Sequence, residues 1–120
     1  MSWRFHNGRL SAPNGGEWSA RSGPWGKGKL PDGLYRIGVA VSLSGAANAS
    51  FKDEANFAWW CPITPRFGTP RTGFGIHPDG GISGTLGCVG IVDGNTRALY
   101  ALLLRAEGET LLDVLSCREM

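Results

Sequence analysis

A chain of 120 residues fits one compact domain, and we treat residues 1–120 as a single unit. Its 19 glycines and seven prolines disfavour a helical bundle, so a mainly β fold with one or two helices is expected. A net charge of +2 gives no strong field for nucleic acid, and no apolar run approaches the roughly 18 residues of a membrane span.

The positive charge is concentrated in the first part of the chain. Residues 1–72 carry nine Lys or Arg against four Asp or Glu, whereas residues 73–120 carry three against six. This asymmetry fits either an anionic substrate group or a mixed, solvated surface. The first ten residues lack the apolar segment of a secretory signal. We therefore expect a protein made in the cytoplasm, with non-classical delivery if its substrate lies outside.

Local patterns predict an opening hairpin. Trp3 and Phe5 alternate with polar residues, as in a half-buried strand. The pair Asn7-Gly8 is a strong two-residue turn signal, so the chain is expected to return at Leu10. Loops rich in small and polar residues are expected at 13–28 and 42–56. Further strands are predicted at 34–41, 57–63, 72–77 and 110–115.

One helix is predicted near the C-terminus. Apolar residues recur there at helical spacing, and Asp93 is a favourable N-cap residue. The helix is expected to run over 95–106 and to end at Gly108.

His77 stands at the predicted end of a strand. It precedes Pro78, and a residue before proline is pushed towards extended geometry. A glycine-rich stretch follows at 80–90. A side chain at a strand end beside such a loop is well placed for catalysis.

Cys88 follows eleven residues later, between Gly87 and the pair Val89-Gly90. The glycines permit a sharp turn, and the N–H groups of Gly87 and Cys88 can converge on an oxyanion. A neighbouring imidazole would activate the thiol and pass its proton to a leaving amine. Because free cysteine is also among the most buried residue types, simple packing stays open as the alternative.

The stretch that begins at His77 resembles the active-site motif of the L,D-transpeptidase family, a histidine followed by Ser-x-Gly-Cys-[Ile/Val]. The matching residues here are Thr85-Leu86-Gly87-Cys88, followed by Val89. Upstream, 33–37 is similar to a family strand, and 71–77 is similar to the strand that leads to its histidine. The opening of the chain and its length are most similar to a compact branch. That branch includes peptidoglycan-targeting toxins of type VI secretion and phage or prophage proteins.

The resemblance implies an L,D-transpeptidase-like β-sandwich or barrel-like catalytic domain. In this family a cysteine attacks the carbonyl between the third and fourth residues of a peptidoglycan stem, D-Ala leaves, and a thioester forms. An amine acceptor then gives transpeptidation, and water gives L,D-carboxypeptidase activity. By resemblance Cys88 is the nucleophile and His77 the base and acid, while Gly87 and Thr85 help to hold the oxyanion. No metal or cofactor is implied.

Two positions depart from the family pattern. Thr85 stands where serine is usual, and Ser83 lies close enough in sequence to be the functional hydroxyl instead. Gly90 stands where many members carry arginine, so that arginine's role does not transfer. The short His77 to Cys88 spacing indicates a trimmed lid and a more open site.

Substrate-binding candidates lie on both sides of the motif. Arg71, and secondarily Arg66, can pair with the stem carboxylate, although surface arginines are often only solvated. Ser83 is a candidate through its hydroxyl. Tyr35 is a candidate by its place in the resembling strand, with core packing as the alternative.

Other polar and aromatic residues near the motif have two interpretations each. Trp59 and Trp60 can line a sugar groove, but neighbours in a strand face opposite ways, so at least one is expected in the core. Asp79 can orient the histidine or simply form a turn. Cys61 and Cys117 are expected to be structural, and a disulfide between them stays open.

The sequence therefore favours a cysteine L,D-transpeptidase or L,D-carboxypeptidase that acts on the cell wall as an antibacterial effector or phage enzyme. Its expected partners are peptidoglycan stems, with an immunity protein or a secretion or virion component. One alternative is a cysteine amidase or peptidase that cuts another peptidoglycan bond. A second alternative is a non-catalytic wall-binding or virion structural domain.

Overall fold

A computed structural model of the chain describes residues 2–6, 8–21, 31–43, 52–69, 73–78, 89–105 and 111–115. These residues form nine strands and one helix: β1 (Ser2–His6), β2 (Arg9–Ser11), β3 (Glu17–Arg21), β4 (Gly33–Ile37), β5 (Val41–Leu43), β6 (Ala58–Pro65), β7 (Gly75–Pro78), β8 (Val89–Ile91), α1 (Arg97–Leu104) and β9 (Leu111–Val114). The expectation of a mainly β protein with few helices is confirmed.

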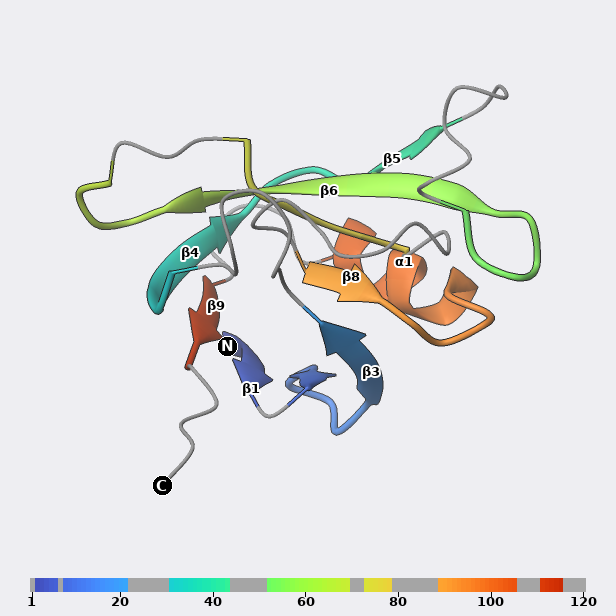
Figure 1. Cartoon of the computed structure of the whole chain (residues 1–120), viewed down its shortest axis with the longest axis horizontal. Helices are drawn as coiled ribbons and strands as arrows, with labels where there is room; N and C mark the ends of the chain where they lie inside the picture. The colour runs from blue at the N-terminus through green and yellow to red at the C-terminus, as the bar shows by residue number, and fades with distance from the viewer. Residues whose placement is uncertain are drawn as a thin grey trace.

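Eight of the strands close into a barrel. Their order is β4-β9-β1-β2-β3-β8-β7-β6, and β6 pairs again with β4. Strand β5 extends the sheet beside β6. Figure 1 shows β6 crossing the molecule, with α1 and β8 on one side of it. An eight-stranded barrel has an interior just wide enough for side chains, so this fold encloses a packed core.

The core is built from the inward positions of these strands. Buried members come from every part of the described chain: Trp3, Leu10, Tyr35, Ile37, Trp59, Cys61, Ile63, Phe74, Ile76, Val89, Ile91, Leu99, Leu103, Leu112 and Val114. Along β7 and β8, Ile76 and Val89 are paired and buried in this core. Because side chains alternate along a strand, the residues that follow them, His77 and Gly90, face outward.

The predicted hairpin is confirmed. Strands β1 and β2 are antiparallel, and His6 pairs with Arg9 across the turn. Gly8 has a φ of +73°, a left-handed conformation that glycine adopts without strain. The first and last strands, β1 and β9, also lie side by side in parallel, with Trp3 opposite Leu112.

Several predicted boundaries are wrong. The expected loop at 13–28 contains β3, which pairs with β2 and β8. The expected strand at 34–41 ends at Ile37 and resumes as β5 at Val41. Strand β8 was not anticipated. These segments are three to five residues long, too short for periodicity, and their pairing partners are distant in sequence.

Strand β6 continues past the predicted end at Ile63 to Pro65. Proline lacks a backbone donor, but the Pro62 carbonyl still accepts a hydrogen bond from the Gly38 N–H at 2.8 Å. An acceptor-only position is thus tolerated within the strand.

The helix is confirmed but begins later than predicted. It runs over Arg97–Leu104, and Thr96 rather than Asp93 is its N-cap residue. The Asp93 carboxylate instead accepts a hydrogen bond from the Ser19 N–H at 3.3 Å. No helix in the described part of the chain is long and apolar enough to cross a membrane.

Candidate functional site

His77 is held on the outer face of the barrel by β7. This strand runs parallel to β8, with Ile76 opposite Val89 and His77 opposite Gly90. His77 is only 6 % exposed, so its ring is largely shielded from water although it faces away from the core. Because histidine is intermediate between buried and exposed residue types, its burial here is compatible with either a structural or a chemical role.

The hydrogen bond of the His77 ring fixes its tautomer. Its Nδ1 lies 2.7 Å from the carbonyl oxygen of Pro78. A carbonyl oxygen only accepts hydrogen bonds, so Nδ1 must carry the proton in the neutral ring. The basic lone pair is then on Nε2, the state that a general base requires.

Trp60 fixes the plane of the His77 ring. The two ring centroids are 5.6 Å apart, and the planes are nearly parallel at 13°. Strand β6 pairs with β7 through Cys61 opposite Ile76, and one step further along this register brings Trp60 opposite His77. The stack leaves the imidazole little freedom to rotate.

Gly75 makes room for this stack. A Cβ atom at Gly75 would overlap the Trp60 ring. Gly75 and His77 lie two residues apart in β7 and so share the outer face. The small residue at 75 therefore allows Trp60 to lie flat beside His77.

The structure separates the two tryptophans as expected. Trp59 is fully buried in the core, and its Nε1 donates a 2.7 Å hydrogen bond to the Thr96 hydroxyl. Trp60 is half-buried on the outer face. The sequence left open which of the two faced outward, and the sheet register decides it.

Most of the remaining predicted site lies outside the described residues. This holds for five of the candidates, Cys88, Gly87, Thr85, Ser83 and Arg71, and for Asp79 and Cys117. Strand β8 begins with Val89, the residue that follows Cys88 in the sequence. Val89 pairs with Ile76, the residue before His77.

Two further carboxylate- or substrate-binding candidates are described. Tyr35 is fully buried, its hydroxyl donates a 2.6 Å hydrogen bond to the Pro31 carbonyl, and its ring meets those of Phe67 and Phe74 edge-on. These contacts give it the packing role that the sequence offered as the alternative. Arg66 is exposed just after β6.

Cys61 is a buried free thiol rather than half of a disulfide. Burial raises its pKa to about 12, so the thiolate does not form at neutral pH. The Sγ contacts the Gly38 carbonyl oxygen at 3.6 Å. Its structural role agrees with the sequence, and it is not a candidate nucleophile.

A second buried polar group lies at the start of α1. The Asp53 carboxylate accepts hydrogen bonds from the Thr96 N–H and hydroxyl at 2.8 and 2.7 Å, and from the N–H groups of Ala55 and Phe57 at 2.8 and 3.0 Å. Burial raises the pKa of Asp53, but the hydrogen bonds outweigh it and leave the pKa below its ordinary 3.8. Sequence reasoning missed this network, since its members are distant along the chain.

Among the described residues, no group of three or more His, Cys, Asp or Glu side chains gathers in a way that could hold a metal ion. No protein-family model matches the chain, and a search of curated proteins finds no significant relative. The motif and the geometry around His77 are therefore the features that bear on function.

Proposed function

We propose that the protein is a cysteine L,D-transpeptidase or L,D-carboxypeptidase that acts on peptidoglycan tetrapeptide stems, with Cys88 as nucleophile and His77 as base. The supporting observation is the parallel pairing of β7 and β8. It joins the strand that carries His77 to the strand that begins one residue after Cys88. His77 therefore lies in a strand whose neighbour begins directly after Cys88, although the two residues are eleven positions apart in the sequence.

The state of His77 also supports the proposal. With the proton on Nδ1, Nε2 can take the thiol proton and later deliver it. The Cys88 thiolate then attacks the carbonyl carbon between stem residues three and four. The C–N bond breaks, D-Ala leaves with the proton from His77, and a thioester remains. A stem amine or water attacks the thioester and releases the thiol.

The sequence pattern suits an effector delivered to the cell wall or a phage-encoded enzyme. In that setting the protein acts in the periplasm, with a cognate immunity protein or a secretion or virion component as its partner. The carboxypeptidase and transpeptidase outcomes share the thioester, so one experiment addresses both.

The test compares wild type with Cys88→Ala on purified tetrapeptide-stem muropeptides, with products read by mass spectrometry. We expect loss or exchange of the fourth-position D-Ala with wild type and none with Cys88→Ala. Cleavage of a different bond would favour the amidase or peptidase alternative. Identical products from the two proteins would contradict the proposal and favour a non-catalytic binding domain.

Thiol labelling gives a matched internal control. In folded protein at neutral pH, Cys61 should remain unmodified because it is buried and its pKa is about 12. An activated Cys88 should react faster than a model thiol, and His77→Gln should slow this reaction. Peptide mapping assigns the label to each cysteine. Equal slow labelling of Cys88 in both proteins would count against activation by His77.

A further inference from the structure

We propose that Trp60 stabilises the protonated, cationic form of His77, and through it a thiolate–imidazolium pair with Cys88. Trp60 is then a positioning residue whose effect on the histidine is electrostatic as well as steric. The part that concerns Cys88 rests on the proposed function, whereas the effect of Trp60 on His77 can be measured without that cysteine.

A positive charge on His77 needs stabilisation because the ring is shielded from water. His77 is 6 % exposed, and loss of water disfavours the charged form of an imidazole. When Nε2 takes the proton of a thiol, this charge appears on the shielded ring. Contacts that favour the imidazolium therefore decide how readily the thiolate forms.

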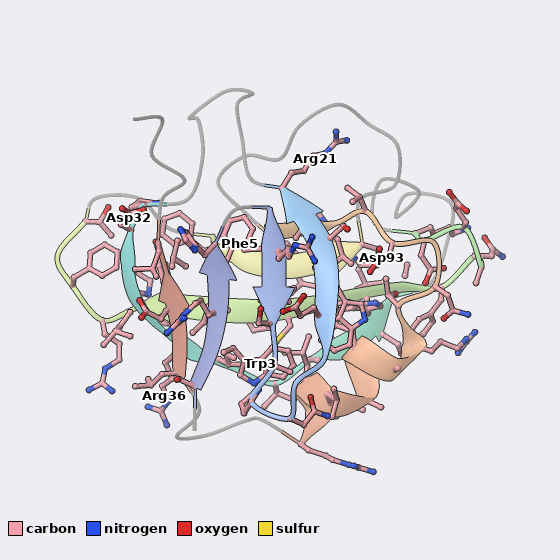
Figure 2. The ribbon with its side chains drawn as sticks, turned by 90° about the horizontal axis from the view of Figure 1, so that it is seen from below. Trp3, Phe5, Arg21, Asp32, Arg36 and Asp93 are labelled. Carbon is pink, nitrogen blue, oxygen red and sulfur yellow. The ribbon has the colours of Figure 1, made fainter. Side chains whose placement is uncertain are left out.

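The strands around His77 offer no carboxylate for this purpose. Strands β6, β7 and β8 contain no Asp, Glu, Lys, Arg or Tyr, and Cys61, their only other titratable residue, lies in the core. Asp93, beyond the end of β8, accepts a hydrogen bond from the backbone of β3. Arg21 pairs with Gly90 in the next strand, and Figure 2 shows its side chain extending from the end of β3. A cation there opposes a second positive charge, so on these strands only uncharged groups can stabilise an imidazolium.

The Trp60 ring is such a group. Its centroid is 5.6 Å from that of the His77 ring, and the two planes are 13° from parallel. A cation within about 6 Å of an aromatic centroid is attracted by the negative face of the ring, and tryptophan is the strongest aromatic partner. The attraction is larger where water is excluded. A neutral imidazole lacks this charge, so the stack favours the protonated ring.

The Pro78 carbonyl acts in the same direction. Its oxygen accepts the hydrogen bond from Nδ1 at 2.7 Å. Nδ1 carries a proton in the neutral ring and in the cation, and the hydrogen bond from the cation is the stronger one. One contact at the edge of the His77 ring and one at its face thus both favour the imidazolium.

The proton that charges His77 comes from Cys88. The S–H bond breaks, Nε2 gains the proton, and the pair becomes a thiolate and an imidazolium with no change in total charge. Nε2 later returns this proton to the amine of the leaving D-Ala. Stabilisation of the imidazolium by Trp60 therefore raises the fraction of Cys88 that is thiolate at neutral pH.

The direct test is an NMR titration of the His77 imidazole in Cys88→Ala protein, with and without Trp60→Leu. We expect the titration midpoint of His77 to fall by about 0.5–1 pH unit when the indole is removed. Trp60→Phe should lower it less, because a phenyl face attracts a cation more weakly than an indole. His6, the only other histidine of the chain, is the internal control, and its midpoint should not move.

The direction of the change separates electrostatic stabilisation from packing. Removal of a covering ring admits water to His77, and water favours the charged form, so loss of packing alone would raise the midpoint. Gly75→Ala, which displaces the Trp60 ring instead of replacing it, should also lower the midpoint and serves if Trp60→Leu does not fold. A His77 midpoint that is unchanged or raised in either folded variant would overturn the proposal.

Thiol labelling extends the test to Cys88. In protein that retains this cysteine, Trp60→Leu should slow labelling about 3- to 10-fold at pH 7. The rates should converge near pH 10, where a thiol ionises without assistance. Trp18→Leu, which removes the partner of Trp3, is the matched control and should label like wild type.

Equal labelling of wild type and Trp60→Leu at pH 7 would overturn the link to Cys88. Release of D-Ala by wild type is measured separately. Its absence would contradict the proposed function and leave the His77 titration as an independent result, so the two failures can be told apart.

Discussion

His77 and Asp53 are both buried polar side chains in the described structure, 6 % and 8 % exposed, but their printed hydrogen bonds differ. Both carboxylate oxygens of Asp53 accept hydrogen bonds, from four donors in all, and these bonds join a loop to the start of α1. His77 uses Nδ1 on a neighbouring carbonyl, which leaves Nε2 as the basic atom. Burial alone therefore does not distinguish a structural polar group from a candidate acid–base group, and replacement of each residue can separate the two roles.

Replacement of His77 should give the largest functional effect. We expect His77→Gln to lower the rate of D-Ala release by about 10²- to 10⁴-fold, the usual contribution of a positioned acid–base group. Thermal unfolding should change little. If the variant lost stability in proportion to activity, His77 would be a residue that stabilises the fold, as Asp53 is, rather than an acid–base group.

Replacement of Asp53 should give the reverse result. Asp53→Ala leaves four donors without their acceptor, and we expect a loss of about 3 kcal/mol in the free energy of unfolding, measured by urea titration. Asp53→Asn, which keeps one acceptor oxygen, should lose less. Activity of the folded fraction should be retained, and a specific loss of turnover would break the contrast with His77.

Alanine substitutions at two glycines test whether the position of Trp60 depends on the space at Gly75. Gly75→Ala should displace Trp60 and cost about 1–3 kcal/mol, because a methyl group there overlaps the indole ring. Gly68→Ala is the control, since a Cβ atom at Gly68 meets nothing within 4 Å. Unfolding titrations of both variants check this. Equal stability would show that Trp60 does not need the space at Gly75.

Loss of the stack itself should have a smaller, kinetic effect. Trp60→Leu should lower kcat by up to about tenfold with little change in KM, because the imidazole is less well oriented. Trp60→Phe should restore most of the rate. Trp18→Leu removes another stacked tryptophan, the partner of Trp3, and should leave kcat unchanged. A rise in KM alone for Trp60→Leu would instead favour a sugar-binding role.

The smallest expected effect is a change in the pH dependence of the unfolding free energy, and it is confined to acid pH. The folded pKa of Asp53 is depressed, so its contribution to stability is complete above the ordinary carboxyl pKa of 3.8 and is lost as the pH falls through the lower, folded value. Unfolding free energies of wild type should therefore fall below about pH 4 more steeply than those of Asp53→Asn. Parallel curves for the two proteins would show that Asp53 does not bring about this loss.

Local chemistry determined a substantial part of this protein from the sequence alone. The Asn7-Gly8 turn specified the hairpin of β1 and β2, and glycine and proline content indicated a mainly β chain. The step before Pro78 indicated an extended His77. Helical spacing of leucines found α1, although not its first residue. In each case the signal acts between residues close along the chain, where backbone sterics and side-chain periodicity are sufficient.

Only the tertiary structure decided which distant residues share a face. The closure of β6 on β4, the parallel pairing of β7 with β8, and the position of Trp60 beside His77 all depend on register between strands that are separated along the chain. Register is set by burying one face of every strand in a common core, and one sequence carries no local record of it. The motif thus indicated His77 and Cys88, while the register of the barrel decided that Trp60 rather than Trp59 stacks on His77.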